Sequence, residues 1–139
     1  MGHTAKHLTI VLEKGDGELW GSIEAPGFLL TSVGASVEKV TTNLRDLVAD
    51  FLKHEGKDMP EWQGIQETDI TYTYEYDLTA LFDVFNAIKI SAIADSAGIN
   101  QSLMRQYATG KKRPSERQAA KIEAAVRQLG ERLMHVQVA

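Results

Sequence analysis

Residues 90–113 are ISAIADSAGINQSLMRQYATGKKR, and this stretch decides the fold of the C-terminal half. It predicts two short helices joined at Gly98, because a sharp turn after a helix favours a residue that tolerates positive φ. Asn100 is placed to cap the second helix by accepting hydrogen bonds from its free backbone amides. The apolar side chains that should turn toward a core are Ile99, Met104 and Tyr107.

The opposite face of this second helix is polar. Its candidate DNA-contacting residues are Gln101, Ser102, Arg105 and Gln106. Amides, hydroxyls and guanidinium groups bind base edges and phosphates in a major groove. A basic loop follows directly, and its candidate phosphate-contacting residues are Lys111, Lys112 and Arg113. The pattern predicts a helix-turn-helix DNA-binding unit; the alternative is an ordinary helical hairpin with a polar outer face.

Charge is divided unevenly along the 139 residues, whose formal net charge is −4. Residues 1–76 contain 6 Lys/Arg and 13 Asp/Glu, whereas residues 77–139 contain 9 Lys/Arg and 6 Asp/Glu. A basic half suits nucleic acid, and an acidic half repels phosphate and attracts basic proteins. We therefore expect two domains, 1–76 and 77–139, with different partners. A merely solvated acidic surface is the alternative for the first.

Alternation of apolar and polar residues predicts strands in the first half. The alternating or apolar runs are residues 8–12, 19–24, 28–33 and 70–76. The first two flank Gly15-Asp16-Gly17 and predict a hairpin. After a potential cap at Ser36, apolar residues spaced by three and four predict an amphipathic helix that ends near His54. We expect an α+β fold, with a small antiparallel sheet and one long helix followed by an all-α unit.

The whole pattern resembles HicB-type antitoxins, in the variant that ends in a Cro/C1-like DNA-binding domain. The resemblance rests on the sheet with one long helix, the following strand and the block GINQSLMRQYATGKK at residues 98–112, and it covers nearly all of residues 8–133. It implies a partial RNase H-like domain that neutralises a small basic RNA-cleaving toxin of the HicA type. It also implies a second domain that represses the shared operon by binding its double-stranded DNA operator.

An alternative function is that of a stand-alone transcription regulator whose N-terminal domain senses a small ligand or only dimerises. An enzymatic function fits less well, because an RNase H-type site needs clustered carboxylates that hold two metal ions. The candidate carboxylates fall on a turn and on outward strand positions: Glu13, Asp16, Glu18 and Glu24. We expect a non-catalytic protein without a cofactor.

Composition excludes further classes. The chain has no cysteine, which rules out disulfides and thiolate metal sites and favours a reducing cytoplasm. No apolar run reaches the length of a membrane span, and the N-terminus lacks signal-peptide character. The four histidines have no metal-ligand spacing: His3, His7, His54 and His135. We expect a cytoplasmic protein without a metal ion or a membrane anchor.

The C-terminal segment predicts a helix and an interface. Ser115 and Gln118 predict a capping box, and a seam of apolar residues follows: Ile122, Val126, Leu129 and Leu133. Beyond the seam, alternating Met134, Val136 and Val138 predict a short strand that needs a partner. We expect this helix and tail to form a two-fold contact in a homodimer. A tail that folds back on its own N-terminal sheet is the alternative.

Overall fold

The computed structural model describes residues 5–139, so His3 lies outside the described residues. Residues 5–139 form one four-stranded sheet and five α-helices, which confirms the α+β class. They divide into two compact units, with the boundary between Ala80 and Leu81. No helix in residues 5–139 is both long and apolar enough to cross a membrane.

The sheet of the first unit has the strand order β3-β2-β1-β4. Its strands are β1 (Lys6–Gly15), β2 (Glu18–Ala25), β3 (Phe28–Gly34) and β4 (Ile70–Tyr76). The predicted hairpin between β1 and β2 is confirmed, with Gly15 paired to Glu18. The two turn residues, Asp16 and Gly17, both have positive φ, 51° and 76°, which is the backbone that a two-residue hairpin turn requires.

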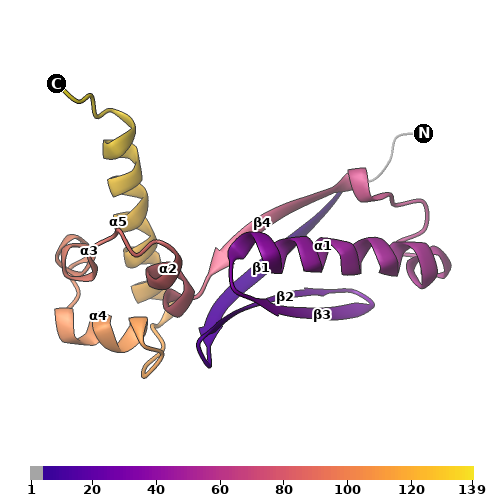
Figure 1. Cartoon of the computed structure of the whole chain (residues 1–139), viewed down its shortest axis with the longest axis horizontal. Helices are drawn as coiled ribbons and strands as arrows, with labels where there is room; N and C mark the ends of the chain where they lie inside the picture. The colour runs from indigo at the N-terminus through magenta and orange to yellow at the C-terminus, as the bar shows by residue number, and fades with distance from the viewer. Residues whose placement is uncertain (1–4) are drawn as a thin grey trace. The chain divides into compact units, whose positions relative to one another are not determined.

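The sheet is mixed, so the expectation of an antiparallel sheet is wrong for one pair of strands. β4 runs parallel to β1, with a register from Lys6↔Ile70 to Leu12↔Tyr76. The cause is helix α1 (Val37–His54), which carries the chain back along the sheet before β4 begins (Figure 1). A crossover of this kind is what parallel strands need, because a tight hairpin can join only antiparallel ones.

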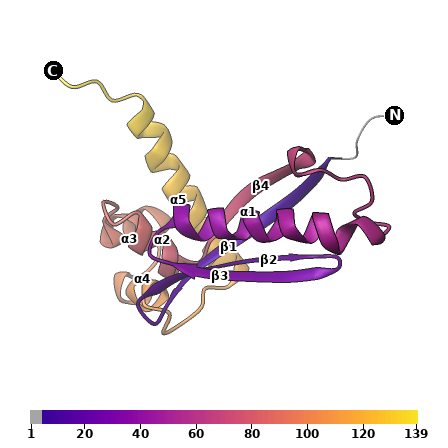
Figure 2. The same cartoon turned by 45° about the vertical axis from the view of Figure 1, so that its right-hand side comes forward.

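Helix α1 covers one face of the sheet (Figure 2). It begins as predicted after Ser36, whose Oγ accepts from the backbone N–H of Lys39 at 3.1 Å. Its buried residues are Val40, Thr41, Leu44, Val48 and Phe51. They pack toward the strand residues Leu8, Ile10, Leu12, Leu19 and Ile23, all of which are buried. A Cβ atom on Gly21 would lie 2.5 Å from Cγ1 of Val40, so the helix approaches the sheet most closely there.

Trp62 anchors the long connection between α1 and β4. This connection contains two short 3-10 helices, η1 (Gly56–Asp58) and η2 (Glu67–Asp69). The buried indole of Trp62 donates from Nε1 to the carbonyl oxygen of Pro26 at 2.7 Å. Its ring packs against Phe28 and Phe51, with centroid distances of 5.3 and 5.7 Å. The connection is thereby fixed to the β2–β3 turn.

The second unit is helical. Its helices are α3 (Ile90–Ala97), α4 (Gln101–Ala108) and α5 (Glu116–Met134), and α2 (Leu78–Val84) precedes them. The core is made by apolar side chains from all three later helices and the α3–α4 turn: Ile93, Ala94, Ile99, Met104, Tyr107, Ile122 and Ala125. Ser115 caps the N-terminus of α5, because its Oγ accepts from the backbone N–H of Gln118 at 3.2 Å. This hydrogen bond is one of the two that the predicted capping box requires.

The predicted strand in the tail is wrong. α5 continues through Met134, and residues 136–139 have no regular secondary structure. The tail adds no strand to the sheet, which consists of β1 to β4. The backbone N–H and C=O groups of a helix form hydrogen bonds within the same segment, whereas those of a strand need a neighbouring strand. Burial falls along the predicted seam of α5, from fully buried Ile122 to Leu133, which is 60% exposed.

Candidate DNA-binding site

The predicted turn between α3 and α4 is present residue by residue. Gly98 adopts the left-handed conformation, with φ 70° and ψ 34°, and ends α3. The next backbone N–H, that of Ile99, donates to the carbonyl oxygen of Ala94 at 2.9 Å. The side chain of Asn100 accepts from the backbone N–H groups of Ser102 and Leu103 at 2.9 and 3.1 Å, so it caps α4.

Buried apolar side chains hold α4 in place. Ile99, Met104 and Tyr107 are buried, as the sequence predicts. An α-helix with its side chains is about 10–12 Å across, which matches the approximate width of a B-DNA major groove, and α4 has 8 residues. A short helix clamped on its inner side presents its outer side chains from a fixed position.

The four candidate residues on α4 are not equally available. Ser102 and Arg105 are exposed, whereas Gln101 and Gln106 are half-buried. Gln101 donates from Nε2 to Oδ1 of Asp95 on α3 at 3.0 Å. The amide oxygen of Gln106 is buried with no hydrogen-bond partner, and a contact of Gln106 with DNA stays a prediction.

The chain after α4 turns back onto the end of the helix, where it contacts the backbone of Gln106. Gly110 has a φ of 80°, and the backbone N–H of Lys112 donates to the carbonyl oxygen of Gln106 at 3.2 Å. The three loop cations, Lys111, Lys112 and Arg113, are all exposed. Their position beyond the C-terminal end of α4 is also favoured by the helix dipole.

The charged side chains of α4 and the loop that follows it are all cations. Between Asp95 and Glu116 the sequence contains four cations, Arg105 and the three in the loop, and no carboxylate. Asp95 is the nearest preceding acid, and its carboxylate already accepts from Gln101. Sequence reasoning missed this contact, because six residues and a turn separate the two side chains. The surface combines exposed donors with four cations, and the carboxylate of Asp95 lies at its edge beside Gln101. Donors and positive charge are the two properties that phosphate and base-edge contacts need.

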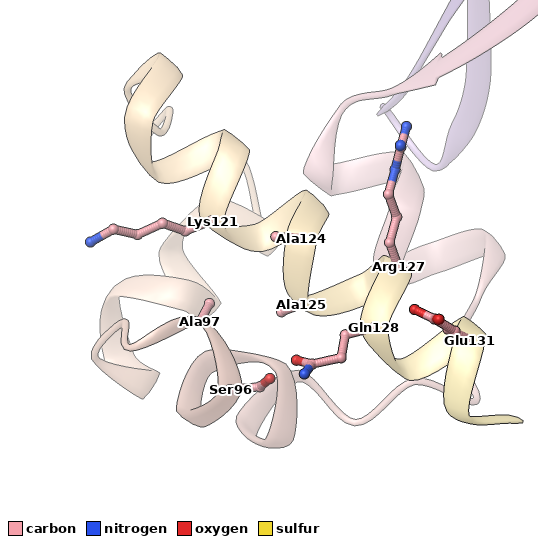
Figure 3. Close-up of a pocket in the computed structure, with 8 residues that line it drawn as sticks. All are labelled: Ser96, Ala97, Lys121, Ala124, Ala125, Arg127, Gln128 and Glu131. Atoms are coloured by element: carbon pink, nitrogen blue, oxygen red, sulfur yellow. The ribbon is translucent and has the colours of Figure 1, made fainter.

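A second feature of the helical unit was not predicted. An open groove of about 540 Å³ lies between α3 and α5 (Figure 3). It is lined by Ser96, Ala97, Lys121, Ala124, Ala125, Arg127, Gln128 and Glu131. Ser96 and Gln128 extend toward one another, and Arg127 is paired with Glu123 at 3.0 Å. The groove arises because α5 offers small alanine side chains where it faces α3.

The acids and histidines of the first unit are dispersed. Glu13, Glu18 and Glu24 are exposed on strands, and Asp16 lies on a turn. Within residues 5–139, no group of three or more His, Cys, Asp or Glu side chains is arranged to hold a metal ion. The ring nitrogens of His7 each lie 2.9 Å from a threonine hydroxyl, those of Thr71 and Thr73. His54 Nε2 lies 3.4 Å from Oδ1 of Asp50.

Two tyrosines of β4 interact with an arginine of α1. Arg45 donates from Nη2 to the hydroxyl of Tyr74 at 2.6 Å, and its guanidinium carbon lies 5.0 Å from the centroid of the Tyr72 ring. The hydroxyl of Tyr72 is buried without a hydrogen-bond partner. Burial raises the pKa of Tyr72 above its usual value of 10.0, although the charge of Arg45 opposes the shift. Burial also raises the pKa of Tyr76.

No protein-family model matches the chain, and comparisons with curated proteins and with solved structures found no match. The case for function therefore rests on the geometry and charge described above.

Proposed function

We propose that the chain is a DNA-binding repressor and antitoxin of the HicB type, with a helix-turn-helix in its C-terminal unit. The observation that carries the DNA-binding part is the surface formed by α4 and its loop. Ser102 and Arg105 project from a helix clamped by its buried side, and Lys111, Lys112 and Arg113 follow it without an intervening acid. We assign Ser102, Arg105 and Gln101 to the major groove and the three loop cations to phosphates.

Charge supports the antitoxin part of the proposal. Residues 1–76 carry more than twice as many acids as bases, 13 against 6, so a small basic toxin of the HicA type is the partner we propose for this half. We propose inhibition by direct binding and no catalytic activity of the chain itself. We also propose that it acts as a homodimer, because two half-sites on DNA require two recognition helices related by two-fold symmetry.

The DNA-binding part is tested with the purified full chain and duplexes selected from a random pool. Specific binding should emerge and should weaken steeply with salt. Neutralising Lys111, Lys112 and Arg113 together should weaken binding about equally on selected and unrelated duplexes. It should also flatten the dependence of log K on log salt by about one unit per lost contact. A triple variant that loses affinity only for selected duplexes would show that the loop recognises bases.

The antitoxin part is tested with the small reading frame adjacent to the chain's gene. Its product should be basic, should stop growth when expressed alone and should be neutralised when the chain is co-expressed. Sequence-specific DNA binding without neutralisation would contradict the antitoxin part and favour a stand-alone regulator that senses a ligand or dimerises through its first unit.

A further inference from the structure

The sheet of the first unit has one face that α1 does not cover. Side chains alternate between the two faces of a strand, and Gly21 and Leu12 face α1. Trp20 and Glu13, which adjoin them in the chain, therefore face the other way. We call this other side the open face and define it by Trp20, Leu29, Val33, Glu13, Glu24 and Glu75.

The open face carries large apolar side chains. Trp20, Leu29 and Val33 are 38%, 66% and 36% exposed, and Trp20 is paired with Val33 across β2 and β3. The indole is held in place because its Nε1 donates to the carbonyl oxygen of Gly15 at 3.2 Å. Leu29 lies two open-face positions along β3 from Val33, beyond the Ser22–Thr31 pair. Single exposed apolar residues are common, but an adjoining pair with a third nearby on the same face is of the kind found at protein interfaces.

Carboxylates flank these apolar residues. Glu13 is the β1 neighbour of Trp20, and Glu24 is the β2 neighbour of Leu29. Glu75 alternates with Thr71 and Thr73, which lie beside His7 on the same side of the sheet. No Lys or Arg occupies any strand position that alternates onto this face. The exposed residues of α1, by contrast, have both signs and include Lys39, Lys53, Asp46 and Asp50.

We propose that the open face is the docking surface for a basic protein that places one apolar side chain against Trp20 and Val33 and another against Leu29, and surrounds them with Lys or Arg. The proposal rests on the proposed antitoxin function and specifies where its partner binds. An apolar centre with a charged rim is the usual composition of such an interface, and complementary charge accelerates association. The same carboxylates disfavour DNA and disfavour a second copy of this face.

The test compares full-length variants for binding to the purified product of the adjacent reading frame. Glu13→Lys with Glu24→Lys reverses two charges on the open face. The matched control, Asp46→Lys with Asp50→Lys, makes the same charge change on the exposed side of α1. The first pair should weaken binding at least tenfold and slow association, and the control pair should change it less than threefold. Leu29→Ala, at a highly exposed position, should also weaken binding tenfold without loss of folding.

The affinity of every variant for the DNA duplexes selected from the random pool is also measured, and it should be unchanged. Equal binding of the partner by the open-face and control variants would overturn the docking surface while leaving the antitoxin function intact. A wild-type chain that does not bind the partner would overturn both. If Leu29→Ala instead lowers the mass of the free chain in solution, the face is occupied by a second copy and the proposal is wrong.

Discussion

At the scale of single residues, the contact between Asp95 and Gln101 sets what α4 can offer to DNA. Nε2 of Gln101 donates one hydrogen to Oδ1 of Asp95 at 3.0 Å, and the hydrogen bond leaves the amide oxygen and the other hydrogen available for a further partner. A glutamine that is oriented before binding loses less side-chain entropy when it contacts a base. Asp95 is therefore a positioning residue, although its negative charge weakens attraction to phosphate.

Two substitutions of Asp95 separate these effects. Asp95→Asn removes the charge and keeps an acceptor for Gln101, whereas Asp95→Ala removes both. Both should strengthen binding to unrelated duplexes to a similar extent. Asp95→Ala alone should relax the preference at the base pair contacted by Gln101, as measured by competition among single-base variants of the selected duplex. If Asp95→Asn relaxes it equally, the hydrogen bond does not position Gln101.

Arg105 is the exposed cation of α4, and we expect it to recognise a guanine. Arg105→Ala should lower specific binding by about 1–3 kcal/mol, because a bidentate contact to a base is lost. The control is Arg127→Ala on α5, which removes an exposed arginine paired only with Glu123 and should leave DNA binding unchanged. Unchanged affinity of the Arg105 variant in a titration against the selected duplex would remove Arg105 from the site.

Tyr72 makes the first unit sensitive to alkaline pH. Because burial raises the pKa of Tyr72 in the folded state, the neutral phenol stabilises the fold fully below the unfolded pKa near 10. That contribution is lost as the pH rises through the folded pKa. The free energy of unfolding should therefore fall above pH 10, and Tyr72→Phe should reduce this fall in urea titrations. At pH 7 the same variant should be as stable as the wild type or up to about 1 kcal/mol more stable, because an unpaired hydroxyl is removed.

Tyr74→Phe is the comparison for that prediction at pH 7. The hydroxyl of Tyr74 accepts a hydrogen bond from Arg45 at 2.6 Å, so Tyr74→Phe removes an existing hydrogen bond. Tyr72→Phe removes a hydroxyl that has no hydrogen-bond partner. It should be less stable than Tyr72→Phe. If Tyr74→Phe were the more stable variant, the Tyr72 hydroxyl would not be the group without a hydrogen-bond partner.

At the scale of elements, the contact of α1 with the sheet depends on the absence of a side chain at Gly21. An added Cβ would meet Val40 Cγ1 at 2.5 Å and Leu44 Cδ1 at 3.0 Å, both in the buried face of α1. Gly21→Ala should therefore lower the free energy of unfolding by about 1–3 kcal/mol, as overpacked cores do. Gly130→Ala is the matched control, because nothing lies within 4 Å of its Cβ position and α5 is helical there. It should stabilise by about 0.5–1 kcal/mol. Urea titrations that gave both variants the same sign would contradict this account of the packing.

Elements that are specified locally were predictable from sequence. Ser36, Gly98 and Asn100 occupy the caps that their side chains or conformations favour, and α1, α4 and the β1–β2 hairpin begin and end accordingly. Pairing between distant segments was not predictable in the same way. The parallel pairing of β4 with β1 depends on the path of α1, and alternation alone does not distinguish parallel from antiparallel neighbours.

The candidate site shows the same division. Spacing predicts the two short helices, the turn at Gly98 and the burial of Ile99, Met104 and Tyr107. The burial of the Gln106 amide oxygen was not predictable, because helical spacing places Gln106 on the polar face of α4. In the tail, alternating Met134, Val136 and Val138 suggested a strand, but α5 runs through Met134 because helix needs no partner for its backbone.

At the scale of the whole molecule, opposite charges on the two halves fit two different partners. The −7 of residues 1–76 and the +3 of residues 77–139 follow from the sequence, and the positive half contains the α4 surface. In the first unit, the charged residues that define the open face are carboxylates. In the second unit, the charged residues of α4 and the following loop are cations. This division of charge supports the proposal that a basic protein and a nucleic acid bind separate units.

The C-terminal end of α5 and the tail are where we expect two copies to meet. Leu133 and Met134 are 60% and 84% exposed, and Val136 and Val138 beyond them are exposed as well. Two recognition helices bind half-sites about one helical turn of DNA apart, so a dimer contact outside α4 is needed to fix their spacing. Deleting residues 134–139 should convert a dimer to a monomer in light scattering. It should also weaken binding to a two-half-site duplex while leaving single half-site binding and the circular dichroism spectrum of the chain unchanged. A truncated chain that stays dimeric and keeps its affinity for the full duplex would exclude the tail as the contact.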